Sequence, residues 1–412
     1  MIVKNEGHII KKTLLMLNKK IGFDYWVIAD TGSTDNTEEE IRSFSRDSGV
    51  QGTLLNHEWK DFSTNRNMVI SHAEKVSDYM FFFDADDGIE GTPEIPDPLT
   101  KNSYTMKIGH NNAFHRIVIV SSCIEWRYHG VLHETIYPTS RSVTPDAEVI
   151  GGQFMIVPNQ HEGGRTVAGD KYTNDAKVLL EALEDKNCPR HLVGRYQFYL
   201  AQSYECAGDV ESAIKWYANR AATKIGWTEE AYVACVRLGR LYSDLGSDGD
   251  AIKWFLKSTK FSHRRVEGVL GAINLCRNNV SDVALYNMVR CVSPSDYGNP
   301  SQDNLLFAET DAHNVFFINT ALYACNAVGD LESCYQYLKL QMSRMDDLSH
   351  AHLMAACSNM IWLSSRFASD DMSRFYEEIK NDLIERGILN DMIRSLDSAS
   401  ISGEGAIIKP GT

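Results

Sequence analysis

The stretch YMFFFDAD, residues 79–86, gives the strongest indication of the fold. A compact apolar run that ends in acidic residues is typical of a strand buried on both faces of a mainly parallel sheet. Residues 25–29, YWVIA, form a second run of this kind, and Asp30 follows it directly. Because ligands bind beyond the carboxyl ends of such strands, we expect both acidic segments to face one site.

Amphipathic segments separate the apolar runs. Their apolar residues recur at helical spacing and predict three helices, over residues 7–20, from about Thr37, and over 63–73. A short apolar segment, MIV, precedes the first helix. Strands and helices therefore alternate, which predicts an α/β domain with a Rossmann-like layering.

Residues 100–157 change to a β pattern. Four short strands are predicted, at Tyr104 to Ile108, Arg116 to Val120, Ile124 to Tyr128 and Phe154 to Val157. We expect these strands to extend the sheet and to carry a lid over the site.

An internal repeat marks the second half of the chain. Residues 204–222, YECAGDVESAIKWYANRAA, align with residues 242–260, YSDLGSDGDAIKWFLKSTK, and a fainter copy covers 325–341. A glycine between two helices at a regular period is typical of tetratricopeptide arrays. The sequence thus predicts an α/β domain over 1–165, an all-α tetratricopeptide-like repeat domain over 170–400, and an irregular tail over 401–412.

Composition narrows the class of protein. The 412 residues carry a net charge of −14 with 43% hydrophobic residues, which fits a folded protein that repels phosphate backbones. No apolar run is long enough for a transmembrane or signal segment. The nine cysteines include no C-x-x-C pair, so we expect reduced, mostly buried thiols and a cytoplasmic protein.

The acidic segments suggest a particular chemistry. Asp84 and Asp86, two residues apart after a buried strand, can hold a divalent cation and contact a ribose hydroxyl. Asp30 leaves the neighbouring strand and is expected beside them. The alternative is a solvated loop whose carboxylates cap helices.

Four motifs in this order resemble the family 2 glycosyltransferases with a GT-A fold. They are MIVKNE at residues 1–6, DTGSTDNT at 30–37, WKDFSTNRN at 59–67 and FFFDADD at 81–87. The segments YHGVLHE at 128–134 and QHEGG at 160–164, followed by helical repeats, are similar to a subgroup that joins this domain to tetratricopeptide-like helices. Its layout is similar to that of the S-glycosyltransferase acting on the peptide sublancin.

The resemblance implies roles for single residues. It implies that Asp30, Arg66 and Asp84 contact the nucleotide, that Asp86 and Asp84 hold Mn²⁺ or Mg²⁺, and that His161 completes the metal site. Lys4 and Glu6 of the first motif, with Arg165 farther on, are implied to line the nucleotide-sugar site; Arg165 and Lys171 could clamp the diphosphate or simply begin a helix. The cation would neutralise the leaving nucleoside diphosphate.

An inverting transfer also needs a base. The position of Glu134 in YHGVLHE makes it the candidate, with His133 as its orienting partner or as another metal ligand. A buried glutamate that accepts backbone hydrogen bonds is the alternative. Family members more often carry two adjacent acids there, so His133-Glu134 departs from the pattern.

The predicted function is transfer of a hexose from a nucleotide-diphosphate sugar, a UDP-sugar being expected, to an acceptor held partly by the helices. A peptide or protein acceptor is preferred over a glycan, a lipid-linked sugar or a modified nucleobase, and the helices could also form a dimer. The competing interpretations are an inactive nucleotide-binding scaffold and a nucleotidyltransferase that releases pyrophosphate.

Overall fold

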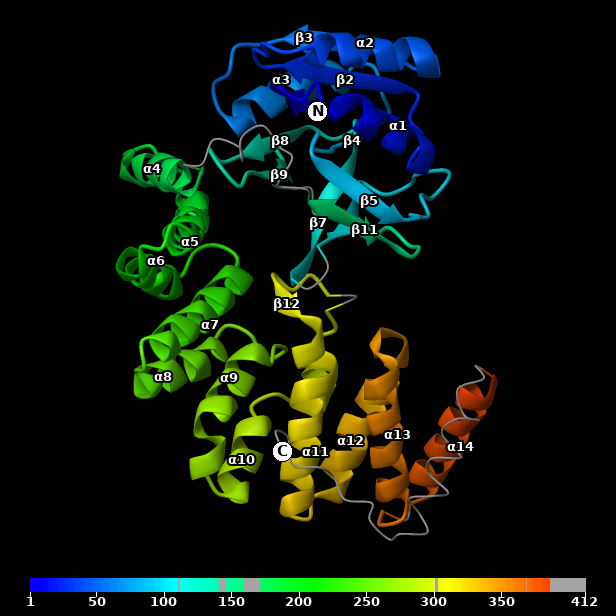
Figure 1. The fold of residues 1–412 in the computed structure, drawn as a ribbon, viewed down its shortest axis with the longest axis vertical. Helices are drawn as coiled ribbons and strands as arrows, with labels where there is room; N and C mark the ends of the chain where they lie inside the picture. The colour runs from blue at the N-terminus through cyan, green and yellow to red at the C-terminus, as the bar shows by residue number, and fades with distance from the viewer. Residues whose placement is uncertain (110–111, 141–145, 159–170, 301–302, 368, 386–412) are drawn as a thin grey trace. The chain divides into compact units, whose positions relative to one another are not determined.

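The computed structural model describes residues 1–109, 112–140, 146–158, 171–300, 303–367 and 369–385. It contains two compact units, formed by residues 1–230 with 304–307 and by 231–303 with 308–412 (Figure 1). The first unit thus holds the α/β domain together with the first helices of the predicted repeat domain. The domain boundary predicted between residues 165 and 170 stays a prediction.

A three-stranded parallel sheet begins the first unit. Its strands are β1 (Ile2–Val3), β2 (Tyr25–Asp30) and β3 (Gln51–Asn56), in that spatial order. Val3 pairs with Asp30 and Asp30 with Asn56, so the three carboxyl ends meet at one edge. The predicted alternation of strands and helices over this part is confirmed.

Helices α1 (Ile10–Lys20), α2 (Thr37–Ser48) and α3 (Phe62–Ala73) connect these strands to the next. The first helix begins at Ile10 and not at residue 7, because Asn5 has a left-handed φ of 56° and the Gly7 amide donates to Asp35. Helices α1 and α2 share a core with the parallel sheet, which includes Ile10, Leu14, Ile28, Ile41 and Phe44.

A mixed sheet makes the rest of the α/β region. Its strands are β4 (Tyr79–Phe81), β5 (Asp87–Gly91), β6 (Ser103–Ile108), β7 (Asn112–Ser121), β10 (Ala147–Val149) and β11 (Phe154–Pro158). The prediction that residues 79–83 form a strand of a mainly parallel sheet is wrong in two respects. The strand ends at Phe81, and it pairs antiparallel with β7, because that long strand offers β4 an edge.

The predicted strand at 124–128 forms a separate hairpin. It is observed as β8 (Trp126–His129) and pairs only with β9 (Thr135–Pro138) among the described residues. Helix α3 packs against this hairpin and β4 through a core formed by Ile70, Met80, Val120, Trp126 and Ile136. Of the four strands predicted over residues 100–157, three belong to the mixed sheet and the one at 124–128 belongs to the β8–β9 hairpin. Strands β5, β9 and β10 were not predicted.

Three helices follow in the first unit: α4 (Lys171–Glu184), α5 (Arg190–Cys206) and α6 (Val210–Ala222). The turn between α5 and α6 contains Gly208 at φ 82°, a left-handed conformation that glycine adopts without steric cost. The amide of Asp209 donates to the Tyr204 carbonyl, which closes the helix end.

The second unit is helical. Its elements are α7 (Thr228–Asp244, which begins in the first unit), α8 (Asp248–Ser258), α9 (Glu267–Cys276), α10 (Asp282–Val289), the short strand β12 (Ala308–Glu309), a π-helical turn (Ala312–Phe316), α11 (Phe317–Ala327), α12 (Leu331–Met342), α13 (His350–Ser364) and α14 (Asp370–Glu385). Short 3₁₀ turns cover Arg277–Asn279, Pro294–Asp296 and Met345–Asp347. In the described part of the chain, no helix has both the length and the apolarity to cross a membrane.

The repeated turns have one geometry. Gly246 between α7 and α8 and Gly329 between α11 and α12 have φ values of 74° and 78°, as Gly208 does in the first unit. The amides of Ser247 and Asp330 donate to carbonyls five residues earlier, as the Asp209 amide does. The three predicted helical hairpins are therefore present, whereas their assignment as tetratricopeptide repeats stays a prediction.

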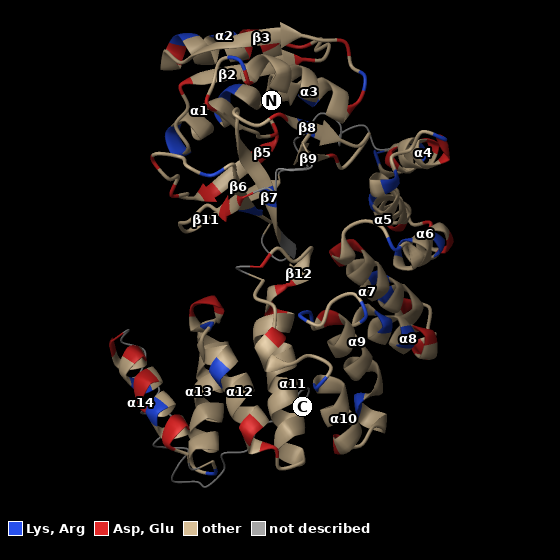
Figure 2. Cartoon of the chain, turned by 180° about the vertical axis from the view of Figure 1, so that it is seen from behind, with Lys and Arg blue, Asp and Glu red and all other residues tan. Residues whose placement is uncertain are grey.

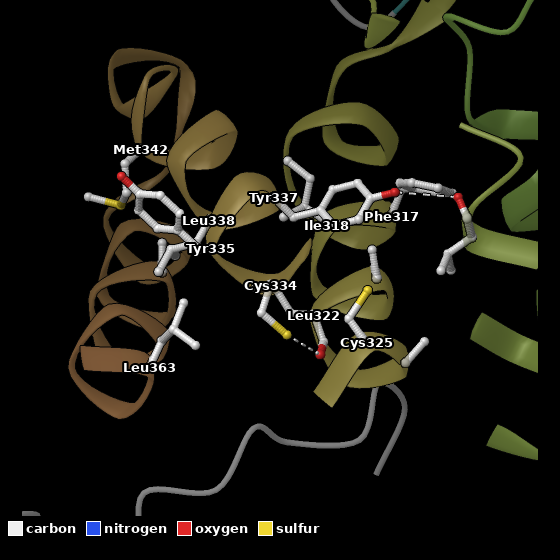
Figure 3. Close-up of a cluster of buried hydrophobic side chains, with 14 of the residues drawn as sticks. Phe317, Ile318, Leu322, Cys325, Cys334, Tyr335, Tyr337, Leu338, Met342 and Leu363 are labelled. Atoms are coloured by element: carbon white, nitrogen blue, oxygen red, sulfur yellow. Dashed lines mark hydrogen bonds between the residues drawn. The ribbon is translucent and has the colours of Figure 1, made fainter. Parts of the chain in front are cut away.

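Helices α11 to α14 lie side by side around an apolar core (Figures 1 and 3). Phe317 and Ile318 of α11 face Tyr337 of α12, whose hydroxyl donates to the Val292 carbonyl. None of the nine cysteines, all of which are described, forms a disulfide. The prediction that most of them are buried is wrong, because only Cys235, Cys325, Cys334 and Cys357 are buried and Cys123, Cys206 and Cys291 are exposed. Positive and negative residues alternate along the surface of α14 (Figure 2), and its exposed ion pairs contribute little to stability.

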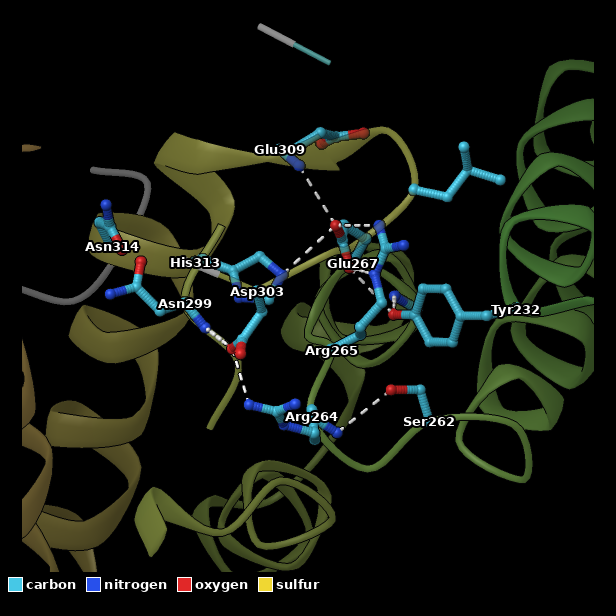
Figure 4. Close-up of polar contacts among 12 residues, drawn as sticks. Tyr232, Ser262, Arg264, Arg265, Glu267, Asn299, Asp303, Glu309, His313 and Asn314 are labelled. Carbon is cyan, nitrogen blue, oxygen red and sulfur yellow. Dashed lines mark hydrogen bonds and ion pairs between the residues drawn. The ribbon is translucent and has the colours of Figure 1, made fainter. Parts of the chain in front are cut away.

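A buried polar cluster surrounds Glu267 at the start of α9 (Figure 4). Its carboxylate accepts hydrogen bonds from Arg265, from the Tyr232 hydroxyl and from the Glu309 amide, and His313 Nε2 lies 3.4 Å away. Burial by itself raises the pKa of Glu267, but Arg265 and His313 outweigh burial and hold the pKa well below its usual range. The cluster therefore ties α7, α9 and the π-helical turn together.

We predict that Glu267→Gln lowers the free energy of unfolding by about 3 kcal/mol at pH 7, because Arg265 loses its buried carboxylate. A depressed pKa stabilises the fold fully above the unfolded value of about 4.3, and the effect is lost as the pH falls. Urea unfolding from pH 7 to pH 3 should show the deficit shrinking below about pH 4. Glu309→Gln, which neutralises an exposed partner of Arg240, is the matched control and should cost below about 1 kcal/mol; equal losses would contradict the prediction.

Candidate active site

Two loops at the carboxyl edge of the parallel sheet are hydrogen-bonded to each other. One follows β1 and contains Lys4 and Glu6, and the other follows β2 and begins at Asp30. The Glu6 amide donates to Thr37 Oγ1, and Asn5 Oδ1 accepts from the Thr34 amide. The first two motifs of the sequence thus form one structural element, with Lys4 exposed on it.

Asp30 is 3% exposed at the end of β2. Its Oδ1 accepts hydrogen bonds from the amides of Gly32 and Ser33 at 2.8 and 2.6 Å, which fix the turn. Its Oδ2 is buried and has no hydrogen-bond partner. Buried carboxylate oxygens normally have partners, so turn formation alone does not account for this residue.

The motif at residues 59–67 builds the start of α3. Asp61 caps the helix by accepting from the Thr64 amide, and the Asn65 side chain bonds Lys60 and Glu58 in the preceding loop. Asn67 exchanges two hydrogen bonds with the backbone of Tyr128, which holds β8 against α3. The residue between these asparagines, Arg66, is therefore rigidly placed.

Arg66 joins two of the predicted site residues. Its Nη2 donates to Asp84 Oδ1 and its Nε to Glu134 Oε1, each at 2.6 Å. All three side chains are largely buried, with exposed fractions of 13% for Arg66, 28% for Asp84 and 12% for Glu134. The guanidinium also lies 5.3 Å from the ring centre of Tyr128, a favourable cation–π contact.

Arg116 and Asp87 complete this network, and neither was predicted as a site residue. Arg116 of β7 contacts Asp84 Oδ2 at 3.4 Å and Asp87 Oδ2 at 3.2 Å. Asp87 was visible as the third acid of DADD, but Arg116 reaches the site only because β7 pairs with β4. We predicted no such antiparallel pairing, so the sequence carried no signal for Arg116.

Burial and neighbouring charges together shift the pKa values of these acids. Burial alone raises the pKa of Asp84, but Arg66 and Arg116 outweigh it and hold the pKa well below its usual range. Burial and the charge of Asp84 raise the pKa of Asp86, and they raise that of Asp87 to about 7. The acidic side chains of this region, Asp84, Asp86, Asp87 and Glu134, thus outnumber its two arginines, Arg66 and Arg116.

The turn of residues 84–86 is anchored through Ala85. Ala85 packs in the core of the parallel sheet, and its carbonyl accepts from the Thr13 hydroxyl. Asp86 forms no ion pair with the described residues, although Lys171 at the start of α4 lies near enough to lower its pKa somewhat. Among the described residues, no three His, Cys, Asp or Glu side chains are arranged to hold a metal ion.

His161 and Arg165, two further predicted site residues, lie outside the described residues. His133 is described: its ring stacks on Tyr199 of α5, with ring centres 3.8 Å apart. The charged group in contact with Glu134 is Arg66, so the alternative of a glutamate held by backbone amides is not what is observed. The orienting role predicted for His133 stays a prediction.

The sequence matches a model of a known protein family over part of the chain. Residues 1–92 match the family model of glycosyl transferase family 2. The match supports a family 2 glycosyltransferase domain at this end of the chain, and with it a nucleotide-sugar donor and glycosyl transfer as the general activity. No curated protein matches the chain.

The matched segment contains Asp30, Arg66, Asp84 and Asp86 and ends within two residues of β5. Glu134, Arg116 and the helices lie beyond it. The acids expected to contact the donor therefore lie within residues 1–92. Glu134 lies outside this segment, and Arg66 connects it to Asp84 by donating a hydrogen bond to each carboxylate.

We predict that Arg66→Met lowers the free energy of unfolding by about 2 kcal/mol, because Glu134 loses its cation and Asp84 keeps only Arg116. Urea unfolding at pH 7 measures the change. Arg127→Met is the matched control, since Arg127 bonds Glu74 and Glu125 at a more exposed position and should cost below about 1 kcal/mol. A smaller loss for Arg66→Met than for the control would show that the network does not stabilise the unit.

Proposed function

We propose that the chain is a metal-dependent, inverting glycosyltransferase that moves a hexose from a UDP-sugar to an acceptor. The observation that carries the proposal is the double contact of Arg66 with Asp84 and Glu134. One arginine thereby joins an acid of the family 2 segment to the candidate base, so donor and acceptor chemistry would take place around one side chain.

The donor would bind along the carboxyl edge of the parallel sheet. Asp30 would face the base or ribose, and its unpartnered Oδ2 supports this assignment, since a donor N–H or O–H would satisfy it. Lys4 and Glu6 belong to the loop that is bonded to the loop of Asp30, which places them at the same edge. Arg66 and Arg116 would neutralise charge on the diphosphate.

Asp86 and Asp84 would hold Mn²⁺ or Mg²⁺, with His161 as a further ligand. The residues fit such an ion because Asp84, Asp87 and Glu134 share Arg66 and Arg116 between them, and because Asp86 has no ion-pair partner among the described residues. Mg²⁺ is commonly bound by one or two carboxylates together with substrate phosphates, so a complete protein cage is not required. When bound, the ion would stabilise the negative charge of the leaving diphosphate.

Glu134 would act as the general base. As the acceptor's oxygen or sulfur attacks the anomeric carbon, its proton passes to the Glu134 carboxylate and the bond to the diphosphate oxygen breaks. UDP leaves with the bonding electron pair, and the configuration inverts. His133 would orient Glu134, and the Glu134 carboxylate alone would accept the proton.

The acceptor would be a peptide or protein held partly by the helices, since hairpin stacks bind extended chains along a continuous surface. A glycan, a lipid-linked sugar and a modified nucleobase are the other acceptor classes, and a dimer through the helices is compatible with each. An inactive scaffold would bind nucleotide without turnover. A nucleotidyltransferase would release pyrophosphate in place of UDP.

We predict that Glu134→Gln lowers UDP release from a UDP-sugar by at least about 100-fold while UDP binding with Mn²⁺ stays within about threefold of wild type, because the variant loses the base but keeps the acids of residues 30–86 that are proposed to bind the donor and the metal. Glu74→Gln, at another arginine-paired glutamate of the first unit, is the matched control and should keep full activity. Full activity of Glu134→Gln would assign the base elsewhere.

Asp86→Asn tests the metal in the same assay. We expect loss of turnover and of the Mn²⁺-dependent part of UDP binding, with helical content unchanged in circular dichroism. Asp248→Asn, in the second D-x-D of the chain at the start of α8, is the control. Turnover that persists in Asp86→Asn and in the presence of a chelator would contradict the metal role.

A further inference from the structure

The loop that carries Glu134 is held by helix α5. The loop leaves β8 at Gly130, which has a φ of 115°, and reaches His133, which has a φ of 49°. A left-handed conformation is unfavourable for a residue with a side chain and persists only where the surroundings hold it in place. In this loop the surroundings are side chains of α5.

Three residues on two successive turns of α5 contact the loop. The Tyr196 hydroxyl accepts a hydrogen bond from the Val131 amide at 3.1 Å. Arg195 Nε donates to the His133 carbonyl at 2.6 Å, and the Tyr199 ring stacks on the His133 ring with an angle of 6° between the planes. Both the backbone and the side chain of His133 are therefore fixed.

Arg195 is itself held by buried charges. Its Nη1 donates to Glu230 Oε1 at 2.9 Å, and Glu230 also pairs with Arg220 of α6, both residues being about 1% exposed. Arg220 in turn donates to the carbonyls of Thr223 and Trp227. Arg195 of α5 therefore contacts the loop from a fixed position, because the buried side chains of Glu230 and Arg220 hold its guanidinium group.

We propose that Tyr199 and Arg195 are positioning residues that hold Glu134 for proton transfer. This inference rests on the proposed function. Glu134 follows His133 directly, so fixing His133 fixes the backbone from which the carboxylate extends, while Arg66 contacts the carboxylate itself. The base is then held at both ends, by a helix that lies outside the family 2 segment and by an arginine inside it. The helices would accordingly contribute to turnover and not only to acceptor binding.

The test compares Tyr199→Leu with two variants. Tyr199→Phe keeps the stacked ring, and Phe44→Leu removes a buried ring of α2 that packs on Phe23 in the core of the parallel sheet. Hydrolysis of UDP-glucose, UDP-GlcNAc or UDP-galactose with Mn²⁺ gives kcat and KM. Hydrogen–deuterium exchange of a peptide that spans residues 129–135 reports the order of the loop without any substrate.

We expect Tyr199→Leu to lower kcat by about 10- to 100-fold with KM within about threefold of wild type, and to speed exchange in the loop. Tyr199→Phe should restore kcat, and Phe44→Leu should lower Tm while keeping kcat. Equal losses of kcat in Tyr199→Leu and Phe44→Leu, or unchanged loop exchange in Tyr199→Leu, would overturn the positioning role. Absence of turnover in the wild-type protein would instead overturn the proposed function, whatever the exchange shows.

Discussion

The guanidinium group of Arg66 holds the candidate site together. It binds Asp84, from the turn after β4, and Glu134, from the loop after β8, each through a hydrogen bond of 2.6 Å. Partly buried carboxylates are costly without a cation, so the two loops can lie this close only with an arginine between them. Arg66 is placed by the cap of α3 and by the contact of Asn67 with Tyr128, so the start of α3 fixes the geometry of the site.

Different parts of the first unit supply different parts of the site. The parallel sheet presents Asp30 and the loop of Lys4 and Glu6, and the mixed sheet adds Arg116 and Asp87. Helix α5, which the sequence assigned to a separate repeat domain, fixes the loop before Glu134. A catalytic role for the chain therefore depends on elements on both sides of the predicted division at residues 165–170.

Local patterns in the sequence predicted much of this structure. An apolar run, an amphipathic helix and a turn glycine can each be recognised from residues that are adjacent in the sequence. For this reason β2, the alternation of strands and helices, and the hairpin at Gly246 could be predicted. The pairing of β4 with β7 could not, since it joins strands that are far apart in the sequence. Arg116 reaches the site through that pairing, and Tyr199 stacks on His133 from a distant part of the chain, so neither was predicted.

Calorimetric titration of the wild-type protein with UDP-glucose, UDP-GlcNAc, UDP-galactose and GDP-mannose, with and without Mn²⁺, measures whether the chain binds a nucleotide sugar together with a metal ion. Each titration is followed by an assay for the released nucleoside diphosphate. We expect a UDP-sugar to bind in a metal-dependent way and to be slowly hydrolysed to UDP. Absence of binding by any nucleotide sugar, with or without metal, would contradict this expectation and would leave the chain a helical scaffold attached to an inactive domain.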